Sequence, residues 1–165
     1  MPVRAWFPTL VYDAPLGADD AAADALRRDL LEECLRLREI DDEGRAWCAE
    51  RYPAGYTSYA TYAQMQRMSS TFGALERHVD AHVRSFARSL QYDLTGRTLS
   101  MTDCWVNVMP RHASHGLHLH PLSTISGTYY VALPAGASPI KLEDPRLALQ
   151  MAAPPRRADA SDRNR

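Results

Sequence analysis

The stretch HGLHLHPLSTISGTYYV, residues 115–131, is the most informative part of this sequence. It places three histidines within six residues and continues as a run of Ser, Thr, Tyr and Val that favours β-structure. Side chains alternate between the two faces of a strand, so His118 and His120 are expected to project to the same side. Two imidazoles at this spacing suit a transition metal. A hydrogen-bonded or solvated histidine pair gives the same pattern.

Short strands are predicted around this stretch, near residues 98–109, 116–120, 124–133 and 139–143. Two amphipathic helices precede them. In residues 19–39, Asp19 or Asp20 is a candidate N-cap, and an apolar stripe follows at helical spacing: Leu26, Leu30, Cys34 and Leu37. The second helix is expected from Ser70 or Thr71, as N-cap, through residue 91, with the apolar stripe Phe72, Leu75, Val79, Val83, Phe86 and Leu90.

The remaining N-terminal segments complete the predicted fold class. Residues 5–12 are predicted to be a short strand, and residues 55–62 a strand or an extended segment. Residues 41–55 are predicted to be a polar connection held to the body by Trp47 and Tyr52. Helices followed by a run of short strands predict an α+β protein with a mainly β core, in which two helices pack on one side of an antiparallel sheet.

Length and composition set the class of protein. The 165 residues suit one domain, and the net charge of −1 gives no electrostatic reason for binding nucleic acid or a membrane. The three cysteines form no CxxC pair, which indicates free thiols in a reducing compartment. No apolar run is long enough to span a bilayer, and no secretory signal is visible, so a cytoplasmic protein is expected.

The other histidines have simpler interpretations. His112 and His115 lie in a predicted loop, where His115 is a candidate for contact with a nearby metal ligand. His78 and His82 have the i, i+4 spacing of a helical chelate. They lack the glutamate of HExxH and border the apolar stripe, so a structural role is predicted for them.

Several metal-binding families share an HxH motif, and the neighbouring residues separate them. Metallo-β-lactamase-like hydrolases require HxHxDH, whereas Pro121, Leu122 and Ser123 follow His120 here. Amidohydrolases need a much larger barrel than this chain can form. Cupins are closer in size, but the glutamate that follows their HxH is missing from PLSTISG.

Residues 105–146, WVNVMPRHASHGLHLHPLSTISGTYYVALPAGASPIKLEDPR, resemble the 2-oxoglutarate/Fe(II)-dependent oxygenases of bacteria and phages. The shared elements are a Trp-x-Asn strand, H-x-H-P, S-G-x-Y-Y-V and a D-P-R after the next turn. The segments FPTLVY and GYTSY are similar to the N-terminal half of that family. The resemblance implies a double-stranded β-helix, or jelly roll, and a 2-His-1-carboxylate iron site that oxidises a C–H bond while 2-oxoglutarate becomes succinate.

Carried over by position, the resemblance implies that His118 and His120 are iron ligands. His120 stands where the family's usual HxD motif has a carboxylate, which is a departure from that pattern. The residues implied to bind 2-oxoglutarate are Ser126, Tyr129, Tyr130 and Asn107, and the two implied to lie next to the site are His115 and Arg146. Ordinary sheet packing is the alternative for the tyrosines, a turn contact for Arg146, and a core position for Trp105.

The C-terminal end departs from the family pattern. No histidine follows His120, and four of the five later arginines lie in a polar tail. We therefore expect one oxygenase-like domain over residues 1–146, with a helical part over 1–97 and jelly-roll strands over 98–146. The barrel formed by these strands is expected to be incomplete. Residues 147–165 are expected to be a tail or a truncated segment. The alternatives are a cupin-like metal-binding module and an inactive remnant. The substrate, a small molecule or a protein, is not encoded in any motif, and exposed strand edges would favour a homo-oligomer.

Overall fold

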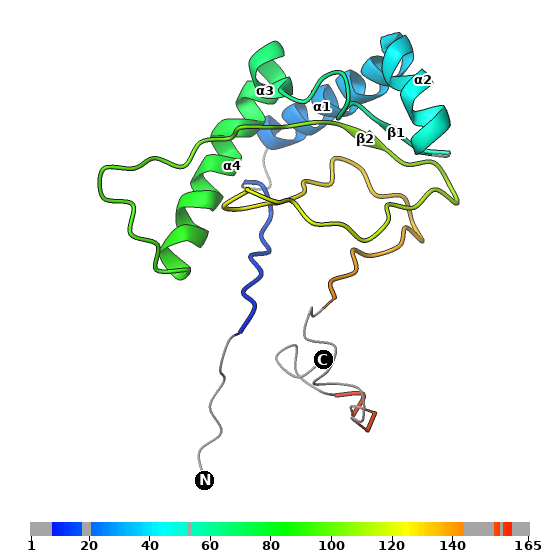
Figure 1. Ribbon diagram of the computed structural model, residues 1–165. Helices are drawn as coiled ribbons and strands as arrows, with labels where there is room; N and C mark the ends of the chain where they lie inside the picture. Colours follow the sequence, from blue (N-terminus) through cyan, green and yellow to red (C-terminus); the bar gives the residue numbers. More distant parts are fainter. Residues whose placement is uncertain (1–7, 18–20, 53, 144–153, 156, 160–165) are drawn as a thin grey trace. The chain divides into compact units, whose positions relative to one another are not determined.

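The computed structural model describes residues 8–17, 21–52, 54–143, 154–155 and 157–159, and the chain divides into two compact units, Met1–Ala132 and Leu133–Arg165. The helices and strands found in the described residues all lie in the first unit (Figure 1). They are α1 Ala21–Ile40, α2 Asp42–Arg51, β1 Tyr56–Thr57, α3 Met65–Met68, α4 Ser70–Ser89 and β2 Asn107–Val108. The chain is therefore α+β, as predicted.

The two long helices form where the hydrophobic periodicity predicted them. Leu30, Cys34 and Leu37 share one face of α1 and are buried, as an i, i+4, i+7 stripe requires. Phe72 and Leu75 at the start of α4 are buried in the same core. Apolar faces of the two helices thus cover each other, which supplies most of the stability of helices of this length.

The ends of these helices differ slightly from the prediction. Ser69 is the N-cap of α4, and its hydroxyl accepts a hydrogen bond from the amide of Thr71. This is one residue before the first predicted cap, Ser70. Asp19 and Asp20, the caps expected for α1, lie outside the described residues.

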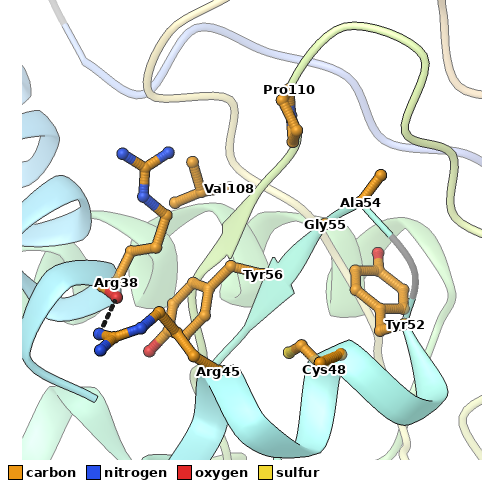
Figure 2. A pocket seen from close by; sticks show the side chains of 10 residues that line it. Arg38, Arg45, Cys48, Tyr52, Ala54, Gly55, Tyr56, Val108 and Pro110 are labelled. Atoms are coloured by element: carbon orange, nitrogen blue, oxygen red, sulfur yellow. Dashed lines mark hydrogen bonds between the residues drawn. The ribbon is translucent and has the colours of Figure 1, made fainter. Parts of the chain in front are cut away.

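The sheet is a two-stranded antiparallel pair, with Tyr56 opposite Val108 and Thr57 opposite Asn107 (Figure 2). Beyond the pair, the amide of Ser58 donates to the carbonyl of Val106 at 2.9 Å. An isolated parallel bridge then joins residues 64 and 104. Residues 104–108 therefore lie along residues 56–65 and are held against the helices.

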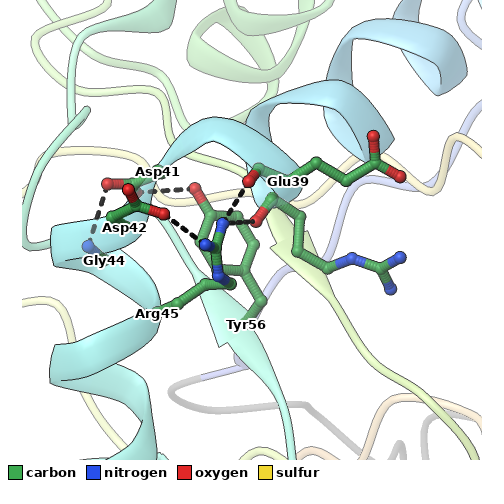
Figure 3. Close-up of polar contacts among 7 residues, drawn as sticks. Glu39, Asp41, Asp42, Gly44, Arg45 and Tyr56 are labelled. Carbon is green, nitrogen blue, oxygen red and sulfur yellow. Dashed lines mark hydrogen bonds and ion pairs between the residues drawn. The ribbon is translucent and has the colours of Figure 1, made fainter.

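The predicted connection 41–55 was wrong, because it contains helix α2. Asp41 starts this helix from a buried position, 3% exposed. Its carboxylate accepts hydrogen bonds from the amide of Gly44 and the hydroxyl of Tyr56, both at 2.8 Å (Figure 3). It also accepts one from the hydroxyl of Thr61 at 2.6 Å. A Cβ on Gly44 would lie 1.9 Å from Asp41 Oδ2, so only glycine fits this first turn. Two of the three donors come from outside the helix, which no local helix signal reveals.

Trp47 and Tyr52 are partly buried and pack against the hydrophobic core, as predicted for this segment. Arg45 lies on the same helix and holds the junction between α1 and α2. Its guanidinium donates to the carbonyl oxygens of Arg38 and Glu39 at the end of α1 and pairs with Asp42 (Figure 3). The last carbonyls of α1 are satisfied in this way.

The strands predicted at 116–120, 124–133 and 139–143 are not strands in the structure, and neither is the described part of 5–12. Within the predicted segment 55–62 only β1 is a strand, and within 98–109 only β2 is a strand; the two pair with each other. A strand exists only where a neighbouring strand accepts and donates its backbone hydrogen bonds. The propensity of these residues is strand-like, but the described residues supply no neighbour for them. The two strands form an open sheet, and the jelly-roll barrel stays a prediction.

The second unit, taken by itself, has no helix or strand among its described residues. A turn is closed by the hydrogen bond from the amide of Ala137 to the carbonyl of Pro134, and Gly136 supplies the positive φ of +80° that this turn needs. Arg157 and Asp159 form an exposed ion pair. None of the helices that the structure describes, in either unit, is long and apolar enough to cross a membrane.

Candidate functional site

Six aromatic rings form one continuous row in the first unit, and three of them are the histidines of HGLHLH. His115 stacks on His118 with centroids 4.6 Å apart, and His118 meets His120 edge to face at 4.9 Å. The remaining rings continue the row at both ends. We call this set the ring row; its members in order are Tyr52, His115, His118, His120, Trp105 and Tyr59.

The two ends of the ring row are attached to the ordered helical part of the unit. Tyr52, the C-cap of α2, packs its ring edge against His115 at 4.9 Å. At the other end Trp105, which comes just before β2, lies 5.7 Å from the ring of His120 and is itself contacted edge-on by Tyr59 at 5.1 Å. The histidines are therefore positioned by aromatic contacts with the helical layer and not by a β-ladder.

Two tight turns bracket the histidines. The amide of Ala113 donates to the carbonyl of Pro110, and that of Ser123 donates to the carbonyl of His120. The third residue of each turn, His112 and Leu122, has a positive φ of +71° and +70°. A positive φ at this position is typical of type II turns, where side chains other than glycine are uncommon. The first turn lies between β2 and His115, the residue that contacts Tyr52 at the end of α2.

The central pair of the ring row has the geometry of two adjacent metal ligands. His118 Nε2 and His120 Nε2 are 3.1 Å apart. Metal–imidazole bonds of about 2.0–2.1 Å, meeting at an angle between right and tetrahedral, separate two nitrogens by roughly 2.8–3.4 Å. The observed separation falls inside this interval, so the two residues fit a shared metal ion.

The tautomer of His118 also fits metal binding. His118 Nδ1 lies 2.8 Å from the carbonyl oxygen of Gly116, which can only accept a hydrogen bond. The proton of neutral His118 is therefore on Nδ1, and its Nε2 carries a lone pair toward His120. A backbone carbonyl that fixes the ligand's other nitrogen is a regular feature of metal-binding histidines. In the protein without metal, His120 Nε2–H donates to this lone pair.

His115 has a different role in the row. Its ring lies nearly parallel to that of His118, at 29°, and so stacks on it rather than directing a nitrogen to the pair. Burial lowers the pKa of His115, and the neighbouring imidazoles of His118 and His120 lower it further. The lowered pKa favours the uncharged form of the His115 imidazole.

The residues implied to bind 2-oxoglutarate are arranged less uniformly. Tyr129 is half-buried and packs against the hydrophobic core without being part of a strand, whereas Tyr130 is 47% exposed. Ser126 and Asn107 are exposed. Arg146 lies outside the described residues. The two hydroxyls of Ser126 and Tyr130 are thus accessible to a small molecule, and that of Tyr129 is less so.

A third metal ligand is not visible in the described residues, which contain no group of three or more His, Cys, Asp or Glu side chains placed to hold a metal ion. His78 and His82 on α4 do not supply it. His82 Nε2 is 2.8 Å from the carbonyl of Leu16 and its Nδ1 is 3.1 Å from the hydroxyl of Tyr12, which ties residues 8–17 to α4. This is a structural role, as predicted for His82.

Sequence reasoning did not place Tyr52 and Tyr59 at this site, and it favoured a core position for Trp105. Trp105 is half-buried, and its ring contacts the ring of His120. One signal pointed to a position of Trp105 outside the core. In the extended segment that leads into β2, Trp105 and Asn107 alternate with Val106, which is buried, so they face the other side. Tyr52 lies 63 positions before His115 in the chain, so its contact is set by the tertiary fold.

The part of the chain that carries the ring row's histidines is also the part that matches a known family. A family model described as "Putative 2OG-Fe(II) oxygenase" matches residues 103–165, which begin just before Trp105. This match supports the family that the motifs of residues 105–146 predicted. A search of curated proteins finds no match.

Proposed function

We propose that this chain is a 2-oxoglutarate- and Fe(II)-dependent oxygenase, with His118 and His120 as two of the iron ligands. The observation that carries the proposal is the 3.1 Å approach of the two Nε2 atoms, inside the segment that matches the family. When bound, Fe(II) with 2-oxoglutarate and O₂ supplies the oxidation of a substrate C–H bond.

The chain's own residues have defined tasks in this proposal. The Gly116 carbonyl keeps the proton of His118 on Nδ1, so that Nε2 stays available as a ligand. His115 and Trp105 cover the outer faces of the two ligand rings and limit their rotation. Hydroxyl donors on Ser126, Tyr129 and Tyr130, with the amide of Asn107, are assigned to the carboxylates of 2-oxoglutarate.

The proposal includes the finer features predicted from the sequence. These are a jelly-roll arrangement of residues 98–146, a cytoplasmic location, and self-association through exposed edges. The third iron ligand is expected to be a side chain with an oxygen or nitrogen donor that does not belong to the ring row. The substrate is a small molecule or a protein side chain.

The test is metal binding with Mn(II) as a redox-stable probe, measured by calorimetry with and without 2-oxoglutarate. We expect wild-type protein to bind Mn(II) more tightly when 2-oxoglutarate is present. His118→Ala should weaken Mn(II) binding by more than about 100-fold, because loss of an outer contact alone costs 10–100-fold. His112→Ala is the matched control: it removes an exposed histidine six residues away that lies outside the ring row.

Unchanged Mn(II) binding in His118→Ala would overturn the ligand assignment. Mn(II) binding that is lost in His118→Ala but indifferent to 2-oxoglutarate would overturn the oxygenase proposal and favour the cupin-like metal-binding module.

A further inference from the structure

A pocket of about 280 Å³ lies between the end of α1, helix α2 and the β1–β2 pair (Figure 2). Small-molecule sites usually measure roughly 300–1,000 Å³, so this volume suits a small ligand. The lining residues on which the argument depends are Arg38, Arg45, Tyr52, Tyr56, Val108 and Pro110.

Arg38 is the chemically unusual member of this lining. Its side chain is half-buried, and it makes no hydrogen bond or ion pair with any residue that the structure describes. Glu39, the next residue in the chain, is not part of the pocket lining and forms no ion pair with Arg38 among the described residues. Asp41 binds Gly44, Tyr56 and Thr61, and Asp42 pairs with Arg45. The guanidinium therefore faces the pocket with its donors unused, and such a group favours a carboxylate or phosphate.

Arg45 adds a second positive charge to the same wall. Its guanidinium is held at the pocket by bonds to the carbonyls of Arg38 and Glu39. One of the two arginines has an acidic partner and the other has none, which leaves the lining with a net positive charge.

The other lining residues used here are apolar toward the pocket. Tyr56, whose hydroxyl donates to Asp41, contributes its ring, and Val108 and Pro110 contribute aliphatic surface (Figure 2). The ring of Tyr52 lies close to the backbone of Gly55, because a Cβ there would be 2.6 Å from that ring. Arginine side chains beside aromatic and aliphatic surface fit an anion with a short apolar body.

Tyr52 connects this pocket to the ring row. The same ring that lines the pocket packs edge-on against His115 at 4.9 Å, and His115 stacks on the proposed ligand His118. A molecule in the pocket is thus separated from the histidine pair by aromatic side chains of the row.

We infer that the pocket binds a small organic anion, with its acidic group at Arg38 and its apolar body along Tyr56 and Val108. As a binding site this assignment is independent of iron. Its use as the substrate site, which would make the substrate class a small aromatic or aliphatic acid, rests on the proposed function.

The test uses benzoate as probe and the full-length chain without metal, with binding followed by NMR titration. We expect saturable binding of benzoate, at least tenfold weaker binding to Arg38→Gln, and no saturable binding of the neutral analogue benzyl alcohol. Arg36→Gln is the matched control, because Arg36 is an exposed arginine of the same helix outside the pocket lining. Phenyl phosphate, titrated in parallel, shows by its relative affinity whether the natural acidic group is a phosphate or a carboxylate.

Absence of saturable binding by both anions, equal binding by Arg38→Gln, or equal binding of benzyl alcohol would overturn the inference. His118→Ala should bind benzoate like the wild type. If Mn(II) binding fails while benzoate binds through Arg38, the proposed oxygenase function fails and the anion site stands.

Discussion

Residues 21–108 and the segment 109–132 that carries the histidines are held by different forces. The first region contains every buried hydrophobic residue that the structure describes, and its helices and strands are closed by regular backbone hydrogen bonds. In the second, no residue is fully buried, and Leu117, Leu119 and Leu122 are 66%, 87% and 105% exposed. The histidine segment keeps its place through turns, ring contacts with the first region, and the partly buried Tyr129 and Val131, which pack against the core.

This difference indicates that stability and chemistry are separable in this chain. Substitutions in residues 21–108 should change the free energy of unfolding. Substitutions in the histidine segment should change ligand binding with little effect on unfolding. The following predictions test that division, beginning with the largest expected effect.

Leu30→Ala should have the largest effect, because Leu30 is 0% exposed in the core between α1 and α4. Lost burial and the cavity left behind should lower the free energy of unfolding by about 2–5 kcal/mol. Leu119→Ala makes the same chemical change at an exposed position and should alter it by less than about 0.5 kcal/mol. Urea denaturation measures both. Equal losses would show that the histidine segment belongs to the core.

Asp41→Ala should lower the free energy of unfolding by about 2–4 kcal/mol. It removes the cap of α2 and leaves the hydroxyls of Tyr56 and Thr61 without their acceptor. Asp42→Ala, next to it in sequence but 86% exposed in its side chain, is the control and should cost less than about 0.5 kcal/mol. Helix content and urea denaturation report the result. A harmless Asp41→Ala would mean that α2 does not depend on this carboxylate.

A pH dependence should follow from the buried thiol of Cys34. Burial, with smaller effects of Glu33 and Cys104, raises its pKa from 9.0 to about 11. The folded state therefore keeps the proton that the unfolded state loses first. Stability is fully present below pH 9 and declines as the pH rises to 11, by about 2 kcal/mol between pH 8 and 10.5. Burial raises the pKa of Cys104 to about 11 as well, so Cys34→Ala should remove the Cys34 share of the slope and leave that of Cys104. An unchanged slope of unfolding free energy would contradict the assignment.

His82→Ala should have the smallest effect, confined to residues 8–17. It removes the partner of both Tyr12 and Leu16 and one of the rings beside Tyr12. Two partly exposed hydrogen bonds correspond to roughly 1–2 kcal/mol of local stability, or about tenfold faster cleavage within the segment in limited proteolysis. Arg77→Ala, at an exposed position of the same helix, is the control. Equal cleavage of both variants would show that the segment is held by other contacts.

Parts of this structure that depend on local patterns were predictable. The steps of three and four between apolar residues placed α1 and α4 correctly, since a helix buries one face wherever it packs. Helix α2 was missed because its cap carboxylate is stabilised by Tyr56 and Thr61, which lie 15 and 20 positions further on. The predicted strands after residue 115 had the right composition but no neighbour among the described residues.

The sequence by itself determined the two long helices, because the helical period is a property of a short stretch of chain. The approach of His118 to His120 was decided by the fold, because residues 116–120 form no strand that would direct both side chains to one face. The tertiary structure alone decided that Tyr52 and Trp105 enclose the histidines and that Arg38 is left unpaired beside an apolar wall. Those contacts join residues far apart along the chain, and only packing of the helical layer brings them together.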